Sequence, residues 1–580
     1  MLKILKYLKP YSWPIVLTIV LTFGQVMANL EIIMFMAKII DQGVLNLNLG
    51  AIVNNGLIML VIALLGAFCT IWAGYLASKI STGFAMKMRE MVFAKVESFS
   101  LVEFDNFSTA SLITRSTNDI QQMQSLVFTM LRMMLVAPFS GIGALILAYQ
   151  TAPSMSWLMA LALTVMILII IILFFLTVPK FKIVQDLTDR INLAARENLT
   201  GLRVIRAFNS EALEEKKFDQ ANQDLTKLNV YLNRLMGLMQ PVMTAIFNIM
   251  TLAIVFIGAR LIGSGELQVG NMIAFMQFAF QVLFSFMMIS MIFIIIPRAA
   301  VSGRRIREVL ETEIGIKDAS HPLAFPAGIS GQIEFKDVTF AYPGAEYPVL
   351  EGISFQAKPG QMTAIVGSTG CGKSTLVNLI PRFYDVCYGE VLVNGVNVKK
   401  LALKDLNDKI GYVPQKGVLF SGTIESNIRY GEPGASKEDL IEASEIAQAK
   451  DFIEQTKKKF QTPISQGGTN VSGGQKQRLA IARALIKKPE IYIFDDSFSA
   501  LDFKTDAALR QALRQETKIA TVLIVAQRIS TILNADQIVV LEAGKIVGAG
   551  KHQDLLKTCS VYKEIALSQL SSEELGDLTK

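Results

Sequence analysis

Residues up to about 300 contain long apolar runs, whereas the rest of the chain mixes apolar and polar positions as globular domains do. A bilayer core requires about 20 consecutive apolar residues for each helix. Six segments reach this length, and the clearest, Trp157 to Val178, carries no charged side chain. Six such runs in half a chain are more than the buried helices of a soluble core would supply. The pattern predicts six membrane-spanning helices, near residues 14–40, 53–78, 127–149, 155–178, 238–259 and 269–296.

Lysine and arginine are unevenly distributed among the connections between these segments. The connections at residues 41–51 and 150–154 contain neither, and the one after Arg260 is short. In contrast, the connection from Lys180 to Arg234 contains ten of them, and the connection between the second and third segments contains Lys87, Arg89, Lys95 and Arg115. Because basic connections stay in the cytoplasm, both chain ends are expected there. The two basic connections are long and helical in pattern, so we expect the membrane helices to project well below the bilayer.

The composition narrows the class of protein. A hydrophobic fraction of 52% excludes an ordinary soluble protein. The net charge of +7 comes from basic residues that lie beside apolar segments, which indicates membrane orientation and not nucleic-acid binding. The cysteines are far apart in the sequence and predict neither a metal site nor a disulfide framework: Cys69, Cys371, Cys387 and Cys559.

Polar side chains inside the apolar segments are candidate functional residues, because they are costly in a membrane. Glu31 and Arg132 are the most obvious charged ones, although Arg132 could also extend to the inner membrane surface. Gln277, Gln281 and Ser285 recur every four residues and therefore share one helical face. This stripe fits either a cavity for varied amphipathic compounds or hydrogen bonds between helices, and the sequence leaves both readings open.

The second half of the chain carries a phosphate-binding motif. Residues 333–340 alternate like a strand, and Met362 to Val366 form a buried strand. The glycine-rich segment Gly367 to Ser374 follows at once and leads into a helix, which is the P-loop spacing in its required context. Its backbone N–H groups converge on phosphates at the positive end of the helix. Lys373 is expected to neutralise the terminal phosphates, and Ser374 to hold Mg²⁺.

Further motifs accompany the P-loop. Val471 to Arg478 reads VSGGQKQR, Tyr412 to Gln415 reads YVPQ, and Asp495 ends an apolar strand. Ser499 to Asp502 reads SALD, and Tyr342 follows the first strand. In this order the motifs resemble the signature, glutamine loop, Walker B strand, D-loop and adenine-stacking aromatic residue of the ATP-binding cassette (ABC) family. Together with the six apolar segments, the resemblance covers nearly the whole chain and is to a half-size exporter.

This resemblance implies an α-helical six-span transmembrane domain fused to a cytoplasmic α/β P-loop nucleotide-binding domain. The expected ranges are 1–310 and 331–580, joined by a linker at 311–330. In the family, two cassettes sandwich two ATP molecules, and each ATP is held by one chain's P-loop and the other chain's signature. The resemblance also places coupling helices near residues 104–118 and 202–209, the second of which contacts the partner chain.

The resemblance assigns roles residue by residue, with ATP and Mg²⁺ as cofactors. The expected ATP contacts are Tyr342, Gly367, Ser368, Thr369, Gly370, Cys371, Gly372, Lys373, Ser374 and Thr375. The expected Mg²⁺ ligands are Ser374, Gln415 and Asp495, and the candidate catalytic residues are Gln415, Asp496 and Gln527. The signature residues that would face the partner's ATP are Ser472, Gly473, Gly474 and Gln475, with Asp502 in the D-loop.

Two of these positions depart from the family pattern. Asp496 replaces the usual glutamate after Walker B, and Gln527 replaces the usual histidine. The shorter side chain draws the carboxylate back, and loss of a well-placed base typically removes about 10²–10⁴ in rate. Gln527 can donate a hydrogen bond but cannot carry a positive charge. Gln466 also replaces an acidic residue before the signature. The alternative is that Asp496 itself works as the base.

The departures resemble the degenerate-site subunit of heterodimeric bacterial multidrug exporters. We therefore expect a second, non-identical half-transporter that carries the catalytic Glu and His. The expected setting is a bacterial cytoplasmic membrane, and the expected substrate is a drug or another hydrophobic or amphipathic compound. The alternatives are a lipid flippase, a peptide exporter, or a cassette protein in which ATP gates or regulates. No nucleic-acid partner is expected.

Overall fold

The computed structural model describes residues 2–326 and 328–569, apart from the side chains of residues 2, 174, 178, 181–182, 290–294, 297 and 503. The chain divides into two compact units. The first comprises Met1–Val96 and Ala110–Glu311, and the second comprises Glu97–Thr109 and Thr312–Lys580. A short segment between the second and third long helices therefore belongs to the unit that contains the P-loop.

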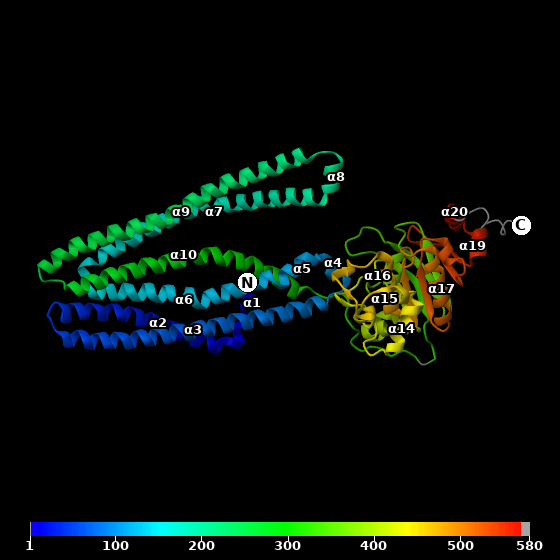
Figure 1. The fold of residues 1–580 in the computed structure, drawn as a ribbon, viewed down its shortest axis with the longest axis horizontal. Coiled ribbons are helices and arrows are strands. Elements are labelled where there is room, and N and C mark those ends of the chain that lie inside the picture. Colours follow the sequence, from blue (N-terminus) through cyan, green and yellow to red (C-terminus); the bar gives the residue numbers. More distant parts are fainter. Residues whose placement is uncertain (1, 327, 570–580) are drawn as a thin grey trace. The chain divides into compact units, whose positions relative to one another are not determined.

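The first unit is built from long helices, six of which are long and apolar enough to cross a membrane (Figure 1). Each predicted apolar segment lies in one of them, which confirms the six-span domain. The long helices are α2 (Ser12–Lys38), α3 (Leu49–Glu97), α6 (Asn118–Thr151), α7 (Ser156–Thr200), α9 (Glu211–Gly263) and α10 (Val269–Glu311). The short ones are α1 (Leu2–Leu5), α5 (Thr109–Ser116) and α8 (Leu202–Ala207), and a π-helical turn, η2, covers Ile39–Val44.

Several helices extend far beyond the apolar segments that predicted them. At 1.5 Å per residue, the 53-residue α9 is about 80 Å long, against roughly 30 Å for a bilayer core. Its first half is polar and carries neighbouring pairs such as Lys217 with Glu214. This polar half forms a helical extension beyond the apolar segment, as the sequence predicted, and α8 closes the hairpin between α7 and α9 (Figure 1).

The polar side chains of the spans have different surroundings. Gln281 donates to the hydroxyl of Ser140 on α6, and the Ser285 hydroxyl donates to the carbonyl of Gln281. These contacts favour the reading of Gln281 as a bond between helices. Gln277 and Glu31 are exposed within this unit. Arg132 is half-buried and its Nη1 donates to the Thr70 carbonyl of α3 at 3.4 Å.

The second unit contains two main sheets. One has the strand order β12-β11-β3-β10-β9-β6, and the other is antiparallel with the order β2-β1-β4-β5. The strands are β1 (Ile333–Phe340), β2 (Leu350–Ala357), β3 (Met362–Gly367), β4 (Tyr388–Val393), β5 (Val396–Asn397), β6 (Ile410–Val413), β9 (Ile491–Asp495), β10 (Thr521–Val525), β11 (Gln537–Glu542) and β12 (Lys545–Gly550). A small pair is formed by β7 (Gly422–Thr423) and β8 (Pro463–Ile464).

Helices cover these sheets. They are α11 (Lys373–Asn378), α12 (Leu403–Asp408), α13 (Ile424–Ile428), α14 (Lys437–Ile446), α15 (Lys450–Gln455), α16 (Gly473–Leu485), α17 (Phe503–Glu516), α18 (Ile529–Ile532), α19 (His552–Thr558) and α20 (Ser560–Gln569). With the short α4 (Leu101–Asn106) they complete the second unit. The fold class is thus confirmed as a helical membrane domain joined to an α/β domain.

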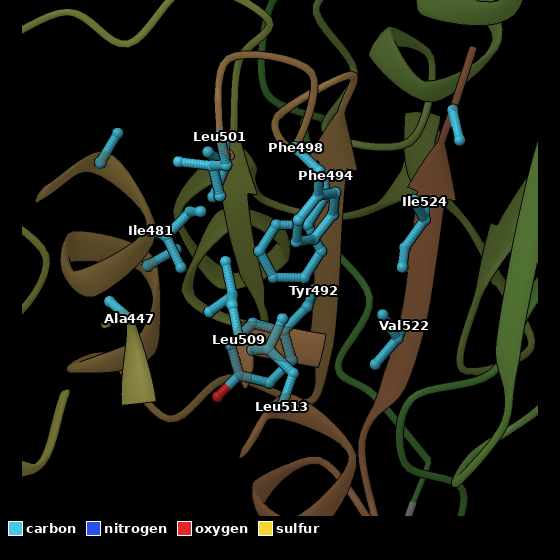
Figure 2. Packing of buried hydrophobic residues seen from close by; sticks show 14 of the residues in the cluster. Ala447, Ile481, Tyr492, Phe494, Phe498, Leu501, Leu509, Leu513, Val522 and Ile524 are labelled. Carbon is cyan, nitrogen blue, oxygen red and sulfur yellow. The ribbon is translucent and has the colours of Figure 1, made fainter. Parts of the chain in front are cut away.

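The central strands are buried on both faces, as parallel strands covered by helices are. Tyr492 and Phe494 of β9 enter one core cluster, and Ile491 and Ile493, which alternate with them along the strand, enter the other. Because successive strand side chains point to opposite faces, β9 links the two cores. Figure 2 shows the first core, where Phe494 and Phe498 lie close together and Ile481 of α16 faces them.

The predicted linker lies on the second unit as an irregular strap. The Gly315 N–H donates to the Glu103 carboxylate, and Arg382 Nη1 donates to the Lys317 carbonyl. The Leu403 N–H donates to Asp318, while the Leu323 N–H donates to the Lys400 carbonyl. In this structure the strap begins at Thr312, directly after α10. It is therefore fixed by hydrogen bonds at several points along its length.

Candidate nucleotide site

The topology of the parallel sheet brings the predicted motifs to one edge. Strands β3, β10, β9 and β6 are parallel neighbours, with Val525 paired to both Ile365 and Asp495. Their carboxyl ends therefore meet, and ligands of open α/β sheets bind at that edge. The P-loop follows β3, Gln415 follows β6, Asp496 follows β9 and Gln527 follows β10.

These segments enclose a pocket of about 350 Å³. Val349 and Val525 line it together with ten of the predicted residues: Tyr342, Thr369, Gly370, Gly372, Lys373, Ser374, Thr375, Gln415, Asp496 and Gln527. The predicted residues Gly367, Ser368, Cys371 and Asp495 do not line the pocket surface.

The P-loop depends on glycine at two positions. Gly372 has a φ of +99°, which favours glycine, and a Cβ there would lie 2.8 Å from Cδ2 of Leu350. At Gly367, a Cβ would lie 2.1 Å from the Leu541 carbonyl oxygen of the adjacent strand. The glycines therefore allow the loop to lie close to β2 and β11, where a side chain would not fit.

Lys373 is buried and folds back over the loop. Its Nζ donates to the carbonyls of Gly367 at 2.9 Å and Ser368 at 2.7 Å. The Ser374 hydroxyl donates to Asp495 Oδ1 at 2.9 Å. A lysine, a serine hydroxyl and a carboxylate are the groups that P-loops direct at terminal phosphates and Mg²⁺. This donor set fits a Mg²⁺-bound nucleotide, in which the cation neutralises phosphate charge.

Asp496 is held by the two glutamines of the pocket. Its Oδ2 accepts hydrogen bonds from Gln527 Nε2 at 2.9 Å and from Gln415 Nε2 at 3.2 Å. The residue is 8% exposed, and its φ of +46° is left-handed. The side chains at the two departing positions therefore contact each other directly, which the sequence motifs did not reveal.

Burial raises the pKa of both pocket carboxylates. For Asp495, burial is the main cause, opposed by the Ser374 hydrogen bond, and the neighbouring Asp496 charge raises its pKa further. For Asp496, burial raises the pKa against the hydrogen bonds from Gln415 and Ser499 and the charge of Lys373. A cation is therefore favourable here, because it would stabilise both charged forms.

Tyr342 lies at the rim of the same pocket. Its hydroxyl is 3.0 Å from the Thr375 hydroxyl of α11, and its half-buried ring lies 5.2 Å from the ring of Tyr384 in an edge-to-face arrangement. An aromatic face at this position can stack on a nucleobase. Tyr384 was not singled out in the sequence, although it follows the P-loop helix by only a few residues.

The signature residues lie away from this pocket, at the start of α16. Ser472 caps the helix through a capping box with Gln475. Ser472 and Gly473 are exposed, and Gly474 and Gln475 are half-buried. Asp502 caps α17 by accepting from Thr505. The start of α16 is therefore exposed and does not line the pocket of its own chain. It stays a prediction that these residues contact the nucleotide on the partner's P-loop.

The two predicted coupling segments are short helices. The first region forms α4 and α5, and α4 begins at Leu101, three residues before the predicted start. The second region forms α8. Only α4 lies in the same unit as the nucleotide pocket. Val102 of α4 packs against the core cluster that includes Phe340 and Tyr384.

Comparisons with known proteins identify both halves of the chain. Residues 15–286 match the family described as ABC transporter transmembrane region, and residues 350–499 match the ABC transporter family. An uncharacterized ABC transporter ATP-binding protein of Mycobacterium tuberculosis is 40% identical over 98% of both chains. The YfiB protein of Bacillus subtilis, also an uncharacterized ABC transporter ATP-binding protein, is 37% identical over 99% of both.

A fatty acid ABC transporter ATP-binding/permease protein of Mycobacterium bovis is 30% identical over 89% of this chain and 81% of its own length. The fold matches a bacterial Atm1-family ABC exporter with ATP bound, with a TM-score of 0.77, 24% identity, and coverage of 97% of this chain and 99% of that one. The chain therefore belongs to the ABC transporter family, as a half-transporter with the exporter fold that couples ATP hydrolysis to transport across a membrane.

Proposed function

We propose that this chain is the degenerate-site subunit of a heterodimeric exporter for drugs or other hydrophobic compounds. The observation that supports this most is the contact between Asp496 and Gln527. A general base must reach the proton that it removes. Here the short Asp496 carboxylate accepts hydrogen bonds from the side-chain amides of Gln415 and Gln527. Gln527 stands where the family has histidine, and an amide cannot carry a positive charge.

In this proposal the two ATP sites differ. The site on Lys373, Asp495, Asp496 and Gln527 binds ATP and Mg²⁺ and hydrolyses slowly. Ser472 to Gln475 complete a second site on the P-loop of a partner chain that supplies Glu and His. Hydrolysis at that second site returns the substrate cavity of the membrane domain to its starting state. ATP retained at the first site keeps the two cassettes partly in contact.

The isolated chain is expected to hydrolyse ATP slowly. The double substitution Asp496→Glu with Gln527→His should raise its turnover by about 10² or more, the scale of a restored general base. The measurement is phosphate release by the purified full-length chain in lipid nanodiscs. Lys373→Met in both backgrounds is the control for contaminating ATPase. Fast turnover of the unmodified chain, at the rate of the double variant, would reject the degenerate site.

The partner is tested by affinity purification of the tagged chain from its own host. The expected result is a second half-transporter with Glu and His at the two positions, and ATPase of the complex well above that of the single chain. Recovery of this chain alone, with full activity, would instead establish a homodimer.

A fatty acid is the second candidate substrate, because one relative of 30% identity is described as a fatty acid transporter. In both proposals ATP hydrolysis by the cassettes drives transport, and only the transported compound differs. Stimulation of the ATPase by a long-chain fatty acid, but not by a cationic hydrophobic dye, would favour this candidate.

A further inference from the structure

The short loop between β10 and α18, residues 526–528, carries Gln527. Its first residue is held by the parallel sheet, since the Ala526 N–H donates to the Ile365 carbonyl of β3 at 3.1 Å. Gln527 is itself exposed, and its side chain lines the nucleotide pocket. The direction of this side chain therefore depends on what fixes the backbone between Gln527 and α18.

Gln569, the last residue of α20, holds that backbone with one side chain. Its Nε2 donates to the Gln527 carbonyl and its Oε1 accepts from the Ile529 N–H, each at 2.8 Å. The two bonded peptide groups flank Arg528, whose φ of −99° and ψ of 125° are extended. One planar amide bonds both groups because, in extended backbone, they point to the same side. The loop is therefore fixed at both ends.

Gln569 also satisfies the start of a helix. The first N–H groups of a helix have no acceptor within it, and Ile529 is the first residue of α18. Arg528 occupies the N-cap position, but an arginine side chain contains no hydrogen-bond acceptor. Oε1 of Gln569 therefore takes the capping role that Ser or Asp usually has. Because Ile529 is fully buried, this bond is costly to lose.

The helix that carries Gln569 is anchored in the core. Tyr562 and Ala566 are fully buried in the same cluster as Ile529 of α18. Positions 562, 566 and 569 are spaced by four and three residues and therefore share one face of α20. The Tyr562 hydroxyl also lies 2.6 Å from Nδ1 of His552 on α19. Gln569 thus reaches the loop from a helix whose position is set by packing.

We propose that Gln569 is a positioning residue of the ATP site, which holds the backbone of Gln527 so that its side chain meets the terminal phosphate. The inference rests on the proposed nucleotide site and goes beyond it, because it gives α20 a part in that site. The Gln527 amide donates to Asp496 Oδ2 at 2.9 Å. Lys373 and Ser374, which P-loops direct at terminal phosphates, line the same pocket. An amide held there can donate to the γ-phosphate of ATP, a group that ADP lacks.

The test compares two nucleotides, both as Mg²⁺ complexes, on the full-length chain in lipid nanodiscs. One is the β,γ-imido analogue of ATP (AMP-PNP), which retains a γ-phosphate and resists hydrolysis, and the other is ADP. Gln569→Met keeps the length and helix propensity of the side chain but removes the amide. It should lower the AMP-PNP affinity by about fivefold, the scale of one hydrogen bond, and change the ADP affinity by less than about twofold.

Two further measurements link this effect to the loop. Gln527→Ala should give the same pattern of affinities, and the double variant should lose no more than Gln527→Ala alone, because both changes act on one contact. Without nucleotide, hydrogen–deuterium exchange at residues 528–532 should be about fivefold faster in Gln569→Met, because the Ile529 N–H loses its acceptor. Gln553→Met is the matched control, since Gln553 is an exposed glutamine on α19 of the same unit. It should leave both affinities and the exchange unchanged.

Three results would overturn the positioning role. They are unchanged exchange at residues 528–532 in Gln569→Met, equal losses of AMP-PNP and ADP affinity, and undiminished AMP-PNP affinity in Gln569→Met when Gln527→Ala lowers it. A failure of the proposed site gives a different result. If Gln527→Ala left the AMP-PNP affinity unchanged while exchange still rose in Gln569→Met, the phosphate contact would be rejected and the attachment of the loop to α20 retained.

Discussion

At the scale of single residues, the backbone at Asp496 explains why an aspartate is accommodated there. Its φ of +46° is a conformation that aspartate and asparagine adopt more readily than longer side chains. Its carboxylate is buried, and burial raises its pKa. The folded state therefore binds the proton more tightly than the unfolded chain, and stability falls as the pH rises above about 4, where the unfolded carboxyl ionises.

Two substitutions at this position should act in opposite directions. Asp496→Asn removes the buried charge and keeps the side-chain shape, so we expect a thermal midpoint at pH 7 equal to or above that of the native chain. Asp496→Glu should lower the free energy of unfolding by about 1 kcal/mol, because the longer side chain tolerates the left-handed backbone less well. Thermal unfolding without nucleotide measures both. A more stable glutamate variant would show that the backbone does not disfavour it.

At the scale of elements, α4 is fixed by one buried carboxylate. Glu103 Oε2 accepts from the Ser100 N–H at 2.7 Å, and Oε1 accepts from the Gly315 N–H of the strap at 3.0 Å. Burial alone would raise the pKa of Glu103, but the hydrogen bonds from Ser100 and Gly315 outweigh it and the pKa is lowered. The stabilisation is thus present above about pH 4.5, the ordinary value for Glu, and is lost as the pH falls through the lowered pKa.

Glu103→Gln should therefore reduce stability by about 1–2 kcal/mol at pH 7, the range for hydrogen bonds to a charged group. The difference from the native chain should narrow as the pH falls below about 4.5, because the unfolded carboxyl then takes up a proton, and it should be lost below the lowered pKa of the folded state. Thermal midpoints at pH 7 and pH 4 measure this. Glu313→Gln, an exposed position of the same strap, is the control. A difference that stays constant with pH would mean that the charge of Glu103 has no part in it.

The elements also show what sequence patterns can and cannot predict. Periodicity and length predicted the six spans, and motif spacing together with the family resemblance predicted the pocket residues, because both depend on local order along the chain. The attachment of α4 to the second unit depends on contacts such as Glu103 with Gly315, which lie 212 residues apart. The bond between Asp496 and Gln527 likewise depends on β9 and β10 being neighbours. Such contacts require the tertiary fold.

At the scale of the whole molecule, the proposed asymmetry separates this chain's own pocket from its signature. Ser472 is exposed at the start of α16 and does not line the nucleotide pocket of its own chain. In the complex with its partner, Ser472→Ala should lower ATPase turnover by about 10² or more, as loss of one phosphate-directed donor does. Asp496→Asn should change it by less than about twofold, because its own site contributes little to turnover.

The serine also caps a helix, so its loss affects stability as well as the partner's nucleotide. Ser436 is the matched control, since it caps α14 through the same kind of capping box, with Asp439. Ser436→Ala and Ser472→Ala should each cost about 1 kcal/mol of stability. If the turnover loss came from a weakened cassette, both variants would show it. If Asp496→Asn slowed the complex as strongly as Ser472→Ala, both sites would hydrolyse ATP and the two-site asymmetry would be wrong. The expected pattern, slow with Ser472→Ala and near normal with the other two, arises only when one site does most of the work.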